Sequence, residues 1–225
     1  MGRALRYAPK HGTRKVAHRT ASAAECIGEL YDGVHVTGLT AGQFSAIDAL
    51  EHIANEIGPC FAWVSTWTTG IYDIQRAADL AKNEHLLGVR MLIDRGTFEK
   101  SPKFAGPLIA ALGADAFRCL SVHAKVTVFV SEDHTPLAVM RSSMNLNKNL
   151  RTEQFDISVD RSVSGFYADW FDVAWDEASV GESNVAIMKA IYSRFLALPS
   201  DADEEPASVD DAGDLDALSL GSLVL

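Results

Sequence analysis

The sequence predicts an α/β protein with a mixed, mostly parallel central β-sheet flanked by helices on both faces. In the first half of the chain, amphipathic helical stretches alternate with short apolar runs that are typical of buried strands. In the second half, hairpin-like strands are followed by two further helical stretches. Apolar residues make up 48% of the 225 residues, which is enough for one continuous core, and no internal repeat divides the chain.

The first predicted element is a helix over 42–57. Its apolar side chains recur at helical spacing, and Gly58 and Pro59 end it. These apolar residues are Phe44, Ile47, Leu50, Ile53 and Ile57. The run 60–67 is mostly apolar and predicts a buried strand, which ends at the turn residues 68–70.

The later elements follow from the same two periodicities. Helices are predicted over 73–85, near 103–112, near 164–178 and near 183–197. Strands are predicted over 87–94 and near 115–120, 122–130, 136–143 and 154–160. Because the strands come first between helices and then in hairpins, we expect one sheet covered on both faces.

Charge divides the chain into three parts. Residues 1–24 form a predicted basic flexible arm, with six Lys or Arg and no acid up to position 19. Residues 199–225 form a predicted acidic disordered tail, with eight Asp or Glu and no base from position 201 onward. We therefore expect one folded domain over 25–198. The apolar stretch 218–225 fits either a frayed terminus or a short docking peptide.

Composition also limits the class of protein. The net charge is −10 and the middle of the chain is acidic, which argues against a broad nucleic-acid-coating surface. Cys26, Cys60 and Cys119 are widely spaced without a C-x-x-C pair, as expected for reduced thiols. Without an apolar run of ~20 residues or a secretory signal pattern, a cytoplasmic location is expected. An organelle transit peptide is the alternative reading of the basic start.

The segment 121–130 is the most informative part of the sequence. Side chains of a strand alternate between its faces, so His123 and Lys125 are expected on one face and the valines on the other. A lone His-x-Lys pair is commonly a hydrogen-bonded or solvent-exposed pair without function. In an otherwise apolar strand, however, an unpaired lysine is costly unless an anion compensates it. The pattern therefore favours an anion-binding site.

A second polar pair occurs on the next predicted strand. Ser143 and Asn145 share the two-residue spacing of His123 and Lys125, and Glu153 opens the strand that follows. We expect these side chains to meet at neighbouring strand ends. They would form a cationic pocket rich in hydrogen-bond donors with one candidate nucleophile, which suits a phosphodiester.

His123-x-Lys125, then Ser142-Ser143-Met144-Asn145 and then Glu153, resembles the H-x-K-x4-D…G-S-x-N signature of the phospholipase D superfamily. The resemblance covers roughly residues 40–180, and the single motif is similar to nuclease-type members. It implies that His123 acts as nucleophile in one copy of the motif and as leaving-group acid in the other. It also implies phosphate contacts from Lys125 and Asn145, support from Ser143, and a Glu153 that orients the imidazole.

Two positions depart from this signature. The family's Asp falls at Val130, and the family's Gly before Ser-x-Asn is Ser142. The nearest acids, Glu132 and Asp133, come two and three residues too late. This acid has a supporting rather than a bond-breaking role in the family, so its absence bears on activity more than on the fold. A catalytically degenerate phosphate- or DNA-binding protein is therefore an alternative to an active enzyme.

The expected activity is that of a metal-independent phosphodiester hydrolase. No cofactor and no metal are expected, because the other histidines are scattered without carboxylates at metal-ligand spacing. Two motifs meet in the family and this chain carries one, so the resemblance implies a homodimer with a shared site. The basic arm favours nucleic acid as substrate, in an endonuclease-like reaction. A phospholipase D-type lipid phosphodiesterase is the alternative, less favoured because no amphipathic membrane-docking helix is evident.

Overall fold

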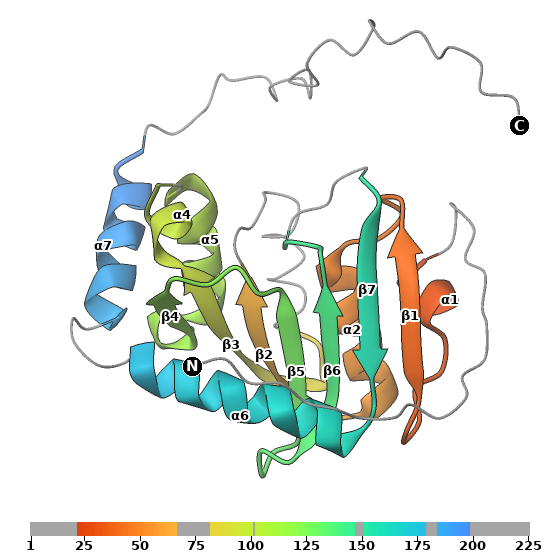
Figure 1. Ribbon diagram of the computed structural model, residues 1–225. Coiled ribbons are helices and arrows are strands. Elements are labelled where there is room, and N and C mark those ends of the chain that lie inside the picture. Colours follow the sequence, from red (N-terminus) through yellow and green to blue (C-terminus); the bar gives the residue numbers. More distant parts are fainter. Residues whose placement is uncertain (1–21, 67–81, 101, 147–150, 179–183, 199–225) are drawn as a thin grey trace, which may run out of the picture.

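A computed structural model describes residues 22–66, 82–100, 102–146, 151–178 and 184–198. Within these ranges, seven strands form one sheet in the order β1-β7-β6-β5-β2-β3-β4, with helices on both faces (Figure 1). The predicted α/β class with a mixed sheet is confirmed. The strands are β1 His35–Thr40, β2 Cys60–Thr66, β3 Leu86–Asp94, β4 Phe117–Leu120, β5 Val126–Val130, β6 Pro136–Ser142 and β7 Glu153–Ser158.

The pairing of the strands differs from the prediction in one respect. Only β2 with β3 and β3 with β4 are parallel, whereas β1–β7, β7–β6, β6–β5 and β5–β2 are antiparallel. The expectation of a mostly parallel sheet is therefore wrong. A turn at 131–135 joins β5 to β6, and such a short connection reverses the chain direction and enforces antiparallel pairing.

The helices divide between the two faces of the sheet. Their bounds are α1 Ala23–Ile27, α2 Ala46–Ile57, α4 Arg95–Lys100, α5 Pro102–Leu112, α6 Arg161–Ala178 and α7 Asn184–Leu196. Helix α6 crosses one face, and α2 lies on the opposite one (Figure 1). The larger core cluster lies on the α2 side and includes residues of α1, α5 and α7, and the second cluster lies under α6.

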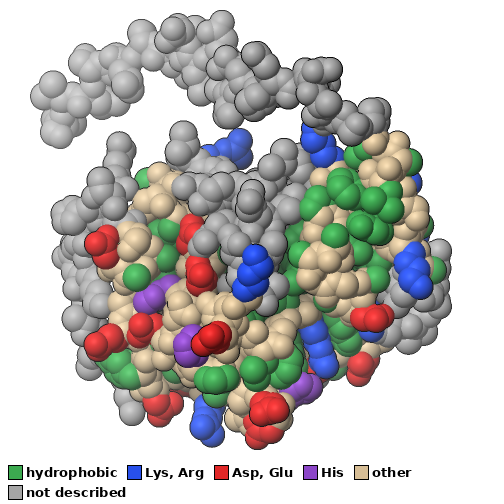
Figure 2. All heavy atoms as spheres, turned by 180° about the vertical axis from the view of Figure 1, so that it is seen from behind, with side chains coloured by type: hydrophobic (Ala, Val, Ile, Leu, Met, Phe, Trp, Pro, Cys, Tyr) green, Lys and Arg blue, Asp and Glu red, His purple; other side chains and the backbone are tan. Residues whose placement is uncertain are grey.

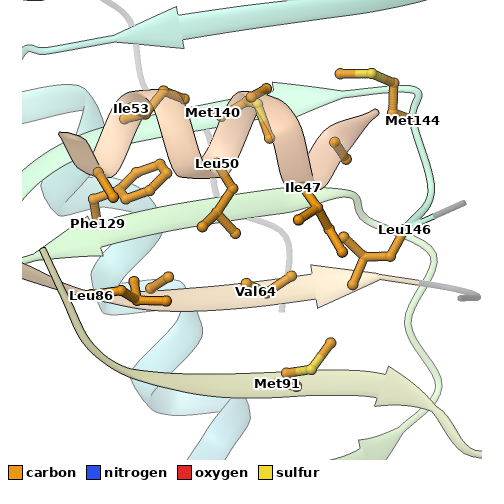
Figure 3. Packing of buried hydrophobic residues seen from close by; sticks show 14 of the residues in the cluster. Ile47, Leu50, Ile53, Val64, Leu86, Met91, Phe129, Met140, Met144 and Leu146 are labelled. Carbon is orange, nitrogen blue, oxygen red and sulfur yellow. The ribbon is translucent and has the colours of Figure 1, made fainter. Parts of the chain in front are cut away.

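Helix α2 forms because its ends are capped and one face is apolar. The Ser45 hydroxyl accepts a hydrogen bond from the Asp48 N–H (3.2 Å), and the Asp48 carboxylate accepts one from the Ser45 N–H (2.8 Å). Gly58 at φ +87° ends the helix. Ile47, Leu50 and Ile53 then pack toward the sheet, as the close view of the core shows (Figure 3).

Helix α6 covers the other face through aromatic packing. Phe171 is fully buried and stacks on Trp63 of β2, with ring centroids 5.4 Å apart. Val128 and Val130 of β5 belong to the same cluster, while Phe129 between them belongs to the α2-side cluster. The alternation expected for a buried strand is thus present in β5.

Most predicted elements are present, and some are displaced or lie outside the described residues. The predictions for 60–67, 87–94 and 103–112 correspond to β2, β3 and α5, and the later helices correspond to α6 and α7. The predicted helix over 73–85 falls mainly outside the described residues, as do the acidic tail and residues 1–21 of the basic arm. Helix α1 begins inside the predicted arm, and β1 and α4 were not predicted. Among the described helices, none has the length and apolarity needed to cross a membrane.

Candidate active site

The predicted site residues lie at one end of the sheet. Strand β2 ends there and β5 begins there, since Ser65 is paired with Val126. Strand β6 also ends there and β7 begins there, since Ser142 is paired with Phe155. The segment 121–125, the segment 143–145 and Glu153 all adjoin this end. Antiparallel pairing therefore brings together groups that are up to 30 residues apart in sequence.

His123 and Lys125 do not lie on the strand as predicted. Strand β5 begins only at Val126, so both residues precede the ladder. Hydrogen bonds from neighbouring residues help to hold this segment instead: Ser142 N–H donates to the carbonyl of Lys125 (3.0 Å), and the Ser65 hydroxyl donates to the carbonyl of Ala124 (2.8 Å). The side chain of His123 is exposed and that of Lys125 is half-buried. The imidazole is accessible to a substrate from solvent.

Lys125 occupies a partly desolvated position. Its ammonium group lies 3.5 Å from the carbonyl oxygen of His123, a long contact. Burial lowers the pKa of Lys125 from its ordinary value, and the nearby Glu153 carboxylate opposes this effect. A poorly hydrated ammonium group is a stronger ligand for an anion than one fully exposed to water, because less hydration is lost on binding.

Ser143 and Glu153 are linked directly. The Ser143 hydroxyl donates to the Glu153 carboxylate and accepts from the Gln154 N–H (2.9 Å). The Ser143 N–H also donates to the Gln154 carbonyl (3.0 Å), which extends the β6–β7 pairing. In this geometry Ser143 orients Glu153 rather than presenting its proton to a phosphate. The roles expected for Ser143 toward phosphate and for Glu153 toward His123 remain predictions.

Asn145 is fixed by its neighbours. Met144 and Leu146 are buried in the core beside α2 (Figure 3), so the backbone of Asn145 is held between two anchored side chains. The Asn145 amide oxygen is buried and has no hydrogen-bond partner among the described residues. Buried polar atoms without partners are uncommon, and they often indicate that a water or ligand completes the arrangement.

Val130 lies far from these groups. It is at the opposite end of β5, four residues beyond Val126, a separation of about 13 Å at the usual rise of a strand. It is fully buried in the cluster under α6 and is paired with Phe61. Residue 130, where the H-x-K-x4-D signature has its aspartate, is therefore a core position in this protein.

The contact of Ser65 with the 121–125 segment was not predicted from the sequence. The sequence feature that could have indicated it is a polar residue near the end of the apolar run 60–67, where a hydroxyl without a hydrogen-bond partner would be costly.

Within the part of the chain that the structure describes, no group of three or more His, Cys, Asp or Glu side chains is placed to hold a metal ion.

No family model and no curated protein matches the chain. Among solved structures, it is similar to Nuc, a phospholipase D family member from Salmonella typhimurium, with 15% identity and a TM-score of 0.45 over 64% of this chain and 94% of that chain. It is also similar to polyphosphate kinase from Porphyromonas gingivalis, with 11% identity and a TM-score of 0.46 over 62% of this chain and 26% of that one. A third similar structure is phosphatidylserine synthase from Haemophilus influenzae, with 13% identity and a TM-score of 0.38 over 72% of this chain and 42% of that chain. These values are too low to indicate a substrate, so the function proposed below rests on the site residues.

Proposed function

We propose that this protein is a metal-independent phosphodiesterase that cleaves nucleic acid through a phosphohistidine intermediate on His123. The observation that supports this most strongly is the convergence of the 123–125 segment with Ser143, Asn145 and Glu153 at one end of the sheet. The exposed imidazole is a suitable nucleophile, and the ammonium group of Lys125, which contacts the backbone carbonyl of His123, supplies positive charge nearby.

The proposed reaction has two displacements at phosphorus. In the first, a neutral imidazole nitrogen of His123 forms a bond to phosphorus while the bond to the leaving oxygen breaks. The protonated His123 of a second chain gives its proton to that oxygen. In the second, water attacks phosphorus and passes a proton back to the second imidazole as the phosphorus–nitrogen bond breaks. Lys125 and Asn145 hold the phosphate oxygens throughout.

Nucleic acid is the substrate class that the charge distribution favours. On the face shown in Figure 2, Lys and Arg side chains are scattered among acidic ones and form no continuous basic stripe. The six basic residues of the N-terminal arm would supply contacts to a phosphate backbone in addition to those of the site. Removing residues 1–21 should weaken nucleic-acid affinity and reduce its salt dependence.

The test is hydrolysis by the purified full chain with EDTA present. The substrates are plasmid DNA, single-stranded DNA, RNA, bis(p-nitrophenyl) phosphate and phosphatidylcholine vesicles. We expect cleavage of nucleic acid and of the dye substrate, abolished by His123→Ala and unchanged by His85→Ala, which alters an exposed histidine at the start of β3. Activity that requires added Mg²⁺ would contradict the mechanism, and cleavage of vesicles alone would favour the lipid alternative.

A further inference from the structure

Ser65 is a buried polar residue near the end of the mostly apolar strand β2. Its side chain is 2% exposed, and the strand that carries it, β2, packs between β3 and β5. A buried hydroxyl without a partner destabilises a protein, so serine at this position requires an acceptor. The acceptor is the carbonyl oxygen of Ala124, 2.8 Å away and 59 residues further along the chain.

This hydrogen bond holds the segment that carries His123 and Lys125. The β2–β5 ladder ends at the pair Ser65 and Val126, so Ala124 lies beyond its last rung. Ala124 stands between His123 and Lys125, and its carbonyl belongs to the peptide unit that joins it to Lys125. Fixing this carbonyl restrains the planar peptide unit, and with it the path of the backbone on either side, to which His123 and Lys125 are attached.

We infer that Ser65 is a positioning residue that sets the orientation of His123 and Lys125 through the carbonyl of Ala124. This inference rests on the proposed function, in which both side chains act on one phosphate. The next peptide unit, between Lys125 and Val126, is held separately by a hydrogen bond from the Ser142 N–H to the Lys125 carbonyl (3.0 Å). Ser65 therefore holds the peptide unit between Ala124 and Lys125, which is one unit closer to His123.

The test compares three variants. Ser65→Ala removes the donor, and Ser65→Thr keeps a hydroxyl in a residue that suits a strand. Ser164→Ala is the matched control, because Ser164 is also fully buried and donates to a backbone carbonyl, that of Asp160 at 2.9 Å. It lies in the first turn of α6, near the end of β7 and away from the site.

For the dye substrate in EDTA, we expect Ser65→Ala to lower kcat/KM by about 10- to 100-fold, mainly through kcat, because attack geometry is sensitive to displacements near 1 Å. Ser65→Thr should keep most of the activity. Ser164→Ala should stay within about twofold of the wild type, even where its melting temperature falls as much as that of Ser65→Ala. Equal kcat values for Ser65→Ala and Ser164→Ala would overturn the inference.

A second readout separates this inference from the proposed function. Nuclear magnetic resonance of the side chain of His123 and of the amides of Ala124 and Lys125 reports their environment without turnover. We expect these signals to shift in Ser65→Ala and to stay in place in Ser164→Ala. A wild-type protein without activity would overturn the proposed function, while the shifts would still support positioning by Ser65. Unchanged signals in Ser65→Ala would overturn the inference in either case.

Discussion

Lys125 and Glu153 together set the charge at the proposed site. Burial favours the neutral form of Lys125 and lowers its pKa, and the carboxylate of Glu153 favours the charged form. Lys125 therefore loses its proton, and with it its attraction for phosphate, at a lower pH than an exposed lysine does. The Ser143 hydroxyl, which donates to Glu153, holds this carboxylate in place.

Replacement of Glu153 by glutamine removes the effect that opposes burial, so the pKa of Lys125 should fall further. The alkaline limb of the plot of kcat/KM against pH should then move to lower pH than in the wild type. Glu132→Gln is the control, because Glu132 is exposed in the turn between β5 and β6. A limb that stays in place in Glu153→Gln, or moves to higher pH, would show that Lys125 does not set it.

Val130 yields a prediction about stability. Aspartate at this position would place a charge in the fully buried cluster under α6, so Val130→Asp should lower the free energy of unfolding by about 4 kcal/mol without raising activity. Val130→Ala, which only removes methyl groups, should cost about 2 kcal/mol. Urea unfolding measures both. If Val130→Asp were as stable as the wild type and more active, our placement of residue 130 outside the site would be wrong.

At the scale of elements, the difference between β5 and its prediction has a physical cause. Alternation of apolar and polar residues continues from 122 to 130, so periodicity alone predicts one long strand. In the described residues the ladder begins at Val126, and the carbonyl of Ala124 accepts a hydrogen bond from the Ser65 side chain. Such a bond between distant residues leaves no periodic signal.

Strand β1 was missed for a different reason. It lies at the edge of the sheet, and most of its residues are partly or fully exposed. It also contains Gly38, and glycine is uncommon in strands, so local propensity does not favour a strand there. The glycine is needed because the ring of Phe155 on β7 occupies the space that a side chain at 38 would take. Contact between β1 and β7 therefore explains a residue that the local sequence does not.

Gly38→Ala should consequently destabilise the protein. Its Cβ would overlap the ring of Phe155, and overpacking of this kind costs about 1–3 kcal/mol. Gly165→Ala on α6 is the matched control, since no atom lies within 4 Å of the added Cβ, and it should stabilise the helix by up to about 1 kcal/mol. Thermal unfolding of both variants checks the pair. Equal effects at the two positions would contradict the packing of β1 against Phe155.

At the scale of the whole molecule, α2, β2 and β3 were predictable because long apolar periods are strong signals. The sequence also predicted that the His123–Lys125 and Ser143–Asn145 pairs adjoin the same end of the sheet, since polar pairs in apolar segments are conspicuous, and their roles stay predictions. The bond from Ser143 to Glu153 and the role of Ser65 could not be predicted, because each depends on which strands are neighbours. The same limit applies to the pairings β1–β7 and β2–β5, which join strands far apart in the sequence.

The single His-x-Lys motif predicts a homodimer with one shared site. A twofold interface would bring two copies of His123 together, and a stable one buries on the order of 1,500 Å². Sedimentation should show a dimer. After subunit exchange with an equal amount of His123→Ala chains, activity should be about one quarter of that of wild-type protein at the same total concentration, because only wild-type pairs keep both imidazoles. Exchange with His85→Ala should leave activity unchanged. A fall to one half, or a fully active monomer, would contradict a shared site.

In the proposed mechanism, His123 becomes covalently bound to phosphorus. The most direct measurement is mass spectrometry of the peptide containing His123, after turnover of bis(p-nitrophenyl) phosphate in EDTA is quenched within milliseconds at alkaline pH. We predict a p-nitrophenylphosphoryl group on His123 that decays as product forms, together with a burst of p-nitrophenolate of about one equivalent per site. Steady turnover without this adduct, or with the adduct on another residue, would contradict the role of His123 as the nucleophile.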